Sequence, residues 1–166
     1  MADLKAVVIG ASAGGVQALL KILPALSADF PVPIMIVLHI PSDRGSLLAS
    51  LFDSKCQLAV KEAEDKDTAT AGTIYFAPPD YHLLVETTAD LALSTDRPVN
   101  YSRPSIDVLF QSAADAFGGS LLAILLTGAS DDGARGLAAV AAAGGTTVIE
   151  DPATAHARAM PDAGIL

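Results

Sequence analysis

Short apolar runs alternate with amphipathic segments in the first part of the chain. Ala6 to Ile9 is a run rich in β-branched residues, and Ile34 to Leu38 is a second, fully apolar run. Apolar residues at helical spacing follow each run, first at Val16, Leu19, Leu20 and Leu23 and then at Leu47, Leu48, Leu51 and Phe52. Because strands that are apolar on both faces are typical of helix-covered parallel sheets, the pattern predicts two strand–helix units of such a sheet.

The middle of the chain has a different pattern. Turn-rich pieces separate four short candidate strands, at Leu58–Lys61, Thr73–Phe76, Leu83–Glu86 and Leu91–Ser94. Such closely spaced short strands are expected to form an antiparallel hairpin or an extension at the edge of the sheet.

Strand and helix signals alternate again in the last third of the chain. The predicted elements are a helix opened by Pro104, a buried strand at Leu121–Leu126, a helix over Gly133–Ala143 ended by Gly144, and a strand at Thr146–Glu150. The fold class is therefore α/β, a doubly wound and mostly parallel sheet sandwiched by helices. We expect one domain over residues 1–166. A doubly wound fold would often close with one more helix after the Pro161 turn, so the pattern fits either a natural end or a missing C-terminal helix.

Composition and charge narrow the class of protein. The chain is 51% hydrophobic, yet no apolar stretch approaches the roughly 18 residues of a membrane span. Its start lacks the pattern of a secretory signal, and a single cysteine, Cys56, allows no internal disulfide. Ten Lys and Arg against nineteen Asp and Glu give a net charge of −9, which disfavours nucleic acid and anionic membranes as partners. We expect a cytoplasmic protein without membrane insertion.

Three loops at predicted strand ends carry reactive side chains. In open α/β sheets the site lies beyond the carboxyl ends of the strands. There the sequence places Gly10–Gly15 with Ser12, His39-Ile40-Pro41, and Thr127–Gly133 with Asp131 and Asp132. A hydroxyl, an imidazole and a carboxylate are the components of a serine-hydrolase triad.

The Ser12 loop fits G-x-S-x-G between a strand and a helix, a turn that exposes a nucleophilic hydroxyl. It lacks the third glycine of a dinucleotide fingerprint, and Val16-Gln17 stand where a phosphate-binding loop has Lys and Ser or Thr. A nucleotide site therefore ranks last. The loop alone leaves open that Ser12 only caps the helix.

His39 follows an apolar strand and suits a general base, although a structural histidine fits the same position. His82, at the start of a candidate edge strand, and His156, in a loop far from any clear strand end, are weaker candidates. One of Asp131 and Asp132 is expected to cap the following helix, and spacing does not choose between them. The order serine, histidine, aspartate differs from that of the α/β-hydrolases, which excludes that family and not the mechanism.

Several segments in register resemble the catalytic domain of the chemotaxis methylesterases, the CheB family. They are Val8–Gly15, His39–Pro41, Lys61–Asp65, Ile74–Pro78, Arg103–Phe110 and Leu126–Gly128 continuing through Asp132–Ala134. The resemblance implies Ser12 as nucleophile, His39 as base and Asp132, rather than Asp131, as the orienting acid. It also implies backbone amides at Ala13 and Ala129 as oxyanion donors, and no metal or cofactor.

The resemblance further implies a function. Members hydrolyse glutamate methyl esters on the cytoplasmic helices of methyl-accepting chemoreceptors and can deamidate receptor glutamines. Many carry a receiver domain, so the resemblance also implies a separate response regulator or kinase as a partner. Ala129, Ala13 and Leu38 stand where methionine, threonine and glutamine are common, which bears on substrate preference more than on catalytic class. A non-catalytic signalling module and an esterase for small molecules remain alternatives.

Overall fold

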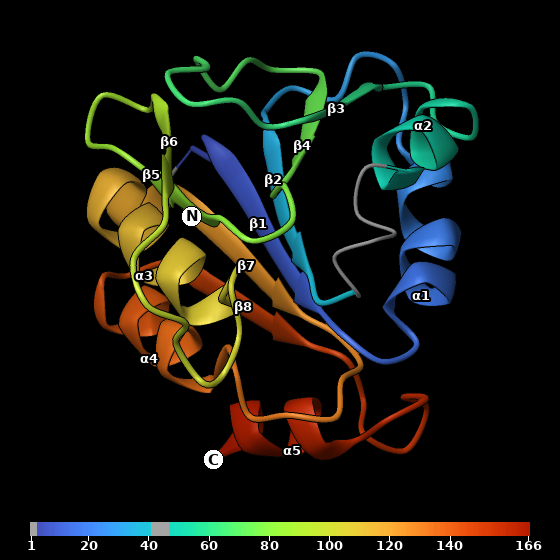
Figure 1. Ribbon diagram of the computed structural model, residues 1–166, viewed down its shortest axis with the longest axis vertical. Helices are drawn as coiled ribbons and strands as arrows, with labels where there is room; N and C mark the ends of the chain where they lie inside the picture. Colours follow the sequence, from blue (N-terminus) through green and yellow to red (C-terminus); the bar gives the residue numbers. More distant parts are fainter. Residues whose placement is uncertain (1–2, 41–46) are drawn as a thin grey trace.

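A six-stranded parallel sheet forms the centre of the fold (Figure 1). The computed structural model describes residues 3–40 and 47–166. The strands of the sheet are β1 (Ala6–Ala11), β2 (Ile34–Leu38), β3 (Ala59–Glu62), β4 (Thr73–Phe76), β7 (Leu121–Leu125) and β8 (Thr146–Ile149), in the spatial order β3-β4-β2-β1-β7-β8. All five neighbouring pairs run parallel, as the apolar runs predict.

Helices cover both faces of this sheet, which confirms the doubly wound α/β class. In Figure 1, α1 (Gly15–Ile22) and α2 (Leu48–Asp53) lie on one face, and α3 (Ile106–Phe117) and α4 (Ala134–Ala142) on the other. Two short 3-10 helices, Leu23–Ala25 and Gly118–Ser120, follow α1 and α3. No helix within residues 3–40 and 47–166 combines the length and apolar character needed to cross a bilayer.

The four short strands of the middle segment divide between the two expected arrangements. β3 and β4 extend the parallel sheet beyond β2, and β4 lies between β2 and β3. β5 (His82–Val85) and β6 (Leu91–Ser94) pair antiparallel as a separate hairpin, which packs against α3. The sequence pattern identifies these strands but not which of them join the main sheet, because that choice depends on contacts with distant segments.

The last helix, α5 (Ala159–Ile165), lies where a turn at Pro161 is expected. Pro161 is the third residue of the helix, within the first turn, where no intrahelical partner for a backbone N–H is needed. α5 contacts α4, β7 and β8 (Figure 1).

Alternating residues of the central strands supply two hydrophobic cores. Val8 points to the core shared with α3, whereas Val7 and Ile9 point to the core shared with α1. Full burial of a side chain of this size contributes about 1.5–3 kcal/mol, so strands buried on both faces are held from two sides. Of these strands, β1 is central and lies between β2 and β7. Because the three strands are parallel, their carboxyl ends lie at the same end of the sheet.

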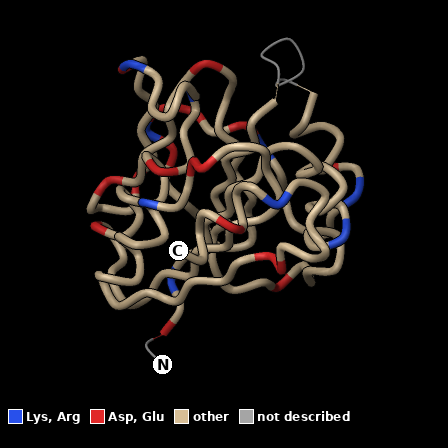
Figure 2. The backbone as a smooth tube through the Cα atoms, turned by 90° about the horizontal axis from the view of Figure 1, so that it is seen from below, with Lys and Arg blue, Asp and Glu red and all other residues tan. Residues whose placement is uncertain are grey.

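Figure 2 marks the positions of the charged residues along the backbone. Over the described residues, Lys and Arg positions are scattered among a larger number of Asp and Glu positions.

Candidate active site

Ser12 directly follows the last residue of β1, in the turn that leads into α1. Its backbone N–H donates to Thr127 O at 2.8 Å, and its carbonyl accepts from Gly15 N at 2.7 Å. Gly14 closes the turn at φ +83°, a left-handed conformation that glycine adopts without strain. The strand end and the turn thus fix the position of Ser12.

The helix-cap interpretation of Ser12 is wrong. The N-cap of α1 is Gly14, and no side chain makes a cap hydrogen bond at this end. The Ser12 hydroxyl is therefore not engaged by the helix that follows it.

His39 directly follows β2 and lies beside Ser12 in the sheet. The β1–β2 register ends with Ala11 opposite Leu38, and His39 N donates to Ala11 O at 3.0 Å. Neighbouring strands lie about 4.8 Å apart, so the chain positions of Ser12 and His39 are adjacent. Pro41, which follows in the same expected loop, lies outside the described residues.

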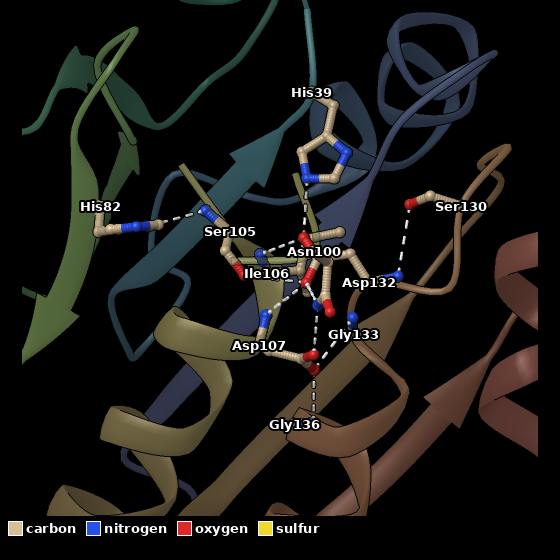
Figure 3. Close-up of polar contacts among 10 residues, drawn as sticks. All are labelled: His39, His82, Asn100, Ser105, Ile106, Asp107, Ser130, Asp132, Gly133 and Gly136. Atoms are coloured by element: carbon tan, nitrogen blue, oxygen red, sulfur yellow. Dashed lines mark hydrogen bonds and ion pairs between the residues drawn. The ribbon is translucent and has the colours of Figure 1, made fainter. Parts of the chain in front are cut away.

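Asp132 is fully buried and accepts five hydrogen bonds (Figure 3). His39 Nε2 donates to Oδ2 at 2.8 Å. The remaining donors are Ile106 N at 2.7 Å, Asn100 Nδ2 at 2.8 Å, Ser105 Oγ at 2.9 Å and Asp107 N at 3.1 Å. A buried carboxylate with this many donors is held as an anion in one orientation.

The helix that Asp132 stabilises is not the one that follows it in sequence. Its carboxylate accepts from the first two amides of α3, whereas the N-cap of α4 is Gly133, without a side-chain cap bond. Asp107 of α3 in turn accepts from Gly133 N at 3.0 Å and Gly136 N at 2.6 Å, at the start of α4. The two helices therefore exchange carboxylate caps. The expectation that Asp131 or Asp132 caps the following helix through its side chain is wrong.

The two buried carboxyl groups have opposite pKa shifts. Burial by itself would raise the pKa of Asp132, but the hydrogen bonds from His39, Ile106 N, Asn100 and Asp107 N outweigh it and lower that pKa below its ordinary value. At Asp107 burial dominates and raises the pKa, and the nearby charge of Asp132 acts in the same direction. Asp132 is thus the carboxylate suited to face an imidazolium.

His82, a weaker candidate for the base, has a structural place. It is buried in β5, where Nε2 lies 2.9 Å from Arg97 O and Nδ1 accepts from Ser105 N at 3.2 Å. These partners assign the proton to Nε2. Both ring nitrogens are therefore occupied, and His82 supports Ser105, itself a donor to Asp132.

Of the three expected catalytic side chains, two are joined directly. Nε2 of His39 is bound to Asp132, while Nδ1 points away from the carboxylate (Figure 3). Within the described residues, no hydrogen bond links the Ser12 hydroxyl to His39. Bonds between nucleophile and base are often long without substrate and shorten when it binds, so adjacency at the strand ends is the relevant observation.

Two backbone N–H groups near Ser12 are available to a ligand. Over the described part of the chain, Ala13 N and Ala129 N have no hydrogen-bond partner, whereas Ser12 N and Gly128 N are bonded to Thr127 O and Ala157 O. The side chains of Ala13 and Ala129 are exposed.

Sequence reasoning missed the contribution of the segment after β8. Thr127 Oγ1 lies 2.8 Å from Ala13 O, to which it donates, and accepts from Ala157 N at 2.8 Å. His156 packs so closely on Gly14 that a Cβ at Gly14 would lie 2.5 Å from that of His156. The placement of His156 far from any strand end is therefore wrong, because its loop returns to the Ser12 turn. The sequence signal for a loop at this end of the sheet is that the loop begins directly after the predicted strand Thr146–Glu150.

The cavity beside His39 is small. A volume of about 200 Å³ is lined by His39, Ile40, Tyr101, Ser102, Arg103 and Pro104. A larger space of about 410 Å³ lies between α1 and strands β7 and β8, but Ser12, His39 and Asp132 are not among its lining residues. Of these three residues, His39 lines the smaller cavity, whose volume suits a side chain rather than a large free ligand.

Comparison with known proteins gives one consistent family. The sequence profile described as CheB methylesterase matches residues 7–165. The crystal structure of the Thermotoga maritima CheB methylesterase catalytic domain is 37% identical, with a TM-score of 0.93 over 98% of this chain and 88% of that chain.

Curated relatives agree with that result. A Leptospira interrogans protein, provisionally named protein-glutamate methylesterase/protein-glutamine glutaminase, is 43% identical over 98% of this chain and 84% of its own length. A Symbiobacterium thermophilum protein with the same two activities in its name is 39% identical over 93% of this chain. The chain spans only 43% of the Symbiobacterium protein. With a matching profile over most of its length and these relatives, the chain belongs to the CheB methylesterase family.

Proposed function

We propose that this chain is a protein-glutamate methylesterase that removes methyl esters from glutamates on the cytoplasmic helices of chemoreceptors, and that it also deamidates receptor glutamines. The observation that carries the proposal is the 2.8 Å bond from His39 Nε2 to buried Asp132, formed beside the strand end that bears Ser12. Members of the family to which the chain belongs are named for both activities.

The first half of the reaction is acylation of Ser12. Nδ1 of His39 takes the hydroxyl proton as Ser12 Oγ attacks the ester carbonyl, and Asp132 stabilises the imidazolium that forms. Collapse of the tetrahedral intermediate breaks the bond to the methoxy group, which leaves as methanol with the proton from His39. The pairing of Nε2 with Asp132 supports this assignment, since it leaves Nδ1 as the nitrogen for proton transfer.

The oxyanion of the intermediate is held by the backbone amides of Ala13 and Ala129. Their lack of partners within the described residues supports this role. Each donor of this kind contributes about 2.7–4 kcal/mol to stabilising the transition state in other enzymes.

The second half is hydrolysis of the acyl-enzyme. His39 removes a proton from water, the hydroxide attacks the acyl carbonyl, and Ser12 leaves with the proton returned by His39. The products are glutamate and free enzyme. A glutamine substrate follows the same course with ammonia leaving in place of methanol.

The open surroundings of His39 favour a protein substrate over a small ester. A free small ester is expected to occupy a deep apolar pocket, whereas the space of about 200 Å³ beside His39 is lined in part by polar residues of the 101–103 segment. Tyr101, which lines this space, is fully exposed, and the small side chains of Ala13 and Ala129 are exposed. An open site of this kind admits a side chain projecting from a helix.

Charge bears on the other partners. With a net charge of −9 and scattered cations, the chain is a poor partner for nucleic acid or an anionic membrane (Figure 2). We place it in the cytoplasm with the receptor helices, under the control of a response regulator or kinase.

A methanol-release assay tests the proposal. Wild-type protein is incubated with methylated receptor cytoplasmic fragments beside Ser12→Ala, which we expect to release no methanol above background while retaining the wild-type circular dichroism spectrum. The matched control is Ser27→Ala, because Ser27 precedes β2 at the opposite edge of the sheet. Equal release by wild type and Ser12→Ala would contradict Ser12 as nucleophile. No release by the folded wild type, despite demonstrated receptor binding, would favour a non-catalytic module.

A further inference from the structure

A tight turn at residues 99–102 presents its two central side chains in different environments. Val99 N donates to Ser102 O and Ser102 N to Val99 O, both at 3.0 Å. Asn100 and Tyr101 between them have φ values of +54° and +63°. This is the backbone of a two-residue hairpin turn, in which asparagine is favoured at the first central position. Tyr101 is exposed to solvent, whereas the Asn100 side chain reaches toward Asp132.

The Asn100 amide connects the two buried carboxylates of the site (Figure 3). Nδ2 lies 2.7 Å from Asp107 Oδ2 and 2.8 Å from Asp132 Oδ1. Both partners are carboxylate oxygens, so only the nitrogen end of the amide can face them, which settles its orientation. Its two N–H groups donate to one oxygen of each carboxylate, two acceptors that would otherwise face each other.

We propose that Asn100 is a positioning residue for the methylesterase reaction, and that its amide holds Asp132 in the orientation and charge state that His39 requires. This inference rests on the proposed function of the Ser12 site. Asn100 acts through Asp132, since Nδ2 contacts the two carboxylates and Asn100 is not among the residues lining the cavity beside His39.

Asn100 is suited to this place because it satisfies two demands at once. The left-handed backbone admits glycine, asparagine or aspartate far more readily than other residues. Of these three, only asparagine has a donor. An aspartate would set a third carboxylate against two others. A glycine would leave Asp107 Oδ2 without its donor and Asp132 Oδ1 with Ser105 Oγ and Asp107 N alone.

Few titratable groups surround this cluster. Asp132 directly contacts two titratable residues, His39 at the end of β2 and Asp107 of α3. His82 of β5 contacts it indirectly, through Ser105. Arg103 follows the turn, but its guanidinium is paired with Asp80 at 2.8 Å. The Asn100 amide is therefore the side-chain donor, beside His39 and Ser105, that compensates the Asp132 charge in the described residues.

Two variants that keep the backbone conformation test the proposal. In Asn100→Gly, we expect kcat for methanol release to fall on the order of 10- to 100-fold, the scale for misplaced catalytic groups, while KM stays at its wild-type value. In Asn100→Asp, the added negative charge favours the imidazolium form, so the acid limb of the kcat/KM profile moves to higher pH by about one unit. Lys66→Gly is the control, because Lys66 is an exposed residue at φ +74° in the connection between β3 and β4.

A second readout does not depend on hydrolysis. The imidazole ¹⁵N resonances of His39, assigned with His39→Gln, are titrated in wild type, Asn100→Gly, Asn100→Asp and the control Lys66→Gly. We expect the midpoint to move to higher pH in Asn100→Asp and to remain at the wild-type value in Lys66→Gly. If Asn100→Asp does not fold, Asn100→Gly provides both readouts, with a loss of kcat and a displaced midpoint expected.

The outcomes separate the two proposals. A folded wild type that releases no methanol refutes the proposed function, and the resonance titration still decides the role of Asn100. An active wild type whose Asn100 variants keep its kcat, acid limb and midpoint overturns the positioning role alone. A lower melting temperature in those variants, without a change in pH profile or midpoint, assigns Asn100 to structure only and also overturns it.

Discussion

The Thr127 hydroxyl donates to the carbonyl of Ala13 at 2.8 Å, a contact between residues 114 positions apart in the sequence. The same oxygen accepts from Ala157 N at 2.8 Å, and the Thr127 carbonyl accepts from Ser12 N. Thr127 is almost fully buried. One side chain therefore ties the Ser12 turn, the end of β7 and the segment after β8 together.

Thr127→Val tests this connection. Valine keeps the shape but leaves Ala157 N and Ala13 O without their partner, which should lower the free energy of unfolding by about 1–3 kcal/mol. We expect kcat for methanol release to fall as well, because the Ala13 amide moves with its carbonyl. Urea denaturation and steady-state kinetics measure the two effects. Thr147→Val, at an exposed position of β8, is the control; an equal loss in both variants would contradict the connection.

Gly14→Ala should disturb the nucleophile turn by two separable effects. The backbone is left-handed at φ +83°, and the new Cβ would meet His156 at 2.5 Å. We expect a loss of stability above the roughly 1–2 kcal/mol of the conformational cost alone, together with a lower kcat.

Gly144→Ala is the matched control for this variant. Gly144 has φ +90°, but its Cβ would meet only the Gly119 Cα at an ordinary 3.7 Å. It therefore reports the conformational cost without the collision. Thermal unfolding and methanol release of both variants give the difference, and indistinguishable results would show that the His156 contact has no effect.

Asp132→Asn should change how stability depends on pH. The pKa of Asp132 in the folded protein is lowered, whereas the pKa of an aspartate in an unfolded chain is about 3.9. Its stabilising contribution is therefore complete above the unfolded value and is lost as the pH falls through the folded pKa. We expect the free energy of unfolding of wild type to exceed that of Asp132→Asn by on the order of 3 kcal/mol at pH 7. This difference should narrow below about pH 4.

Urea titrations at pH 7, 5, 4 and 3 measure that gap. Asp131→Asn is the control, since Asp131 is the exposed neighbour of Asp132 in the same loop. A constant gap at all four values would show that Asp132 is not preferentially ionised in the folded protein.

The sequence was sufficient for the central strands of the main sheet and for which loops meet at their carboxyl ends. Apolar runs reveal strands buried on both faces, and parallel strands bring Ser12, His39 and the Thr127–Gly133 loop together. The partners of Asp132 could not be predicted in this way. Asn100 reaches it from a turn with no periodic signal. The start of α3 belongs to a helix that the sequence predicts, but its contact with Asp132 and the exchange of caps between α3 and α4 depend on how the two helices pack.

Local signals also failed for the final segment. Pro161 reads as a turn residue, yet in the first turn of α5 it costs no hydrogen bond. Similarly, nothing in the residues around His156 indicates that it contacts Gly14, because that contact is made by a loop folding back over the edge of the sheet.

The central position of β1 has a consequence for how the protein should lose activity on heating. Local opening starts at frayed edges and advances inward, and here it would have to pass β3 and β4 on one side or β8 on the other before reaching β1. The backbone that carries Ser12 is thus among the last to exchange its amide protons with solvent. Inactivation should accompany global unfolding instead of preceding it.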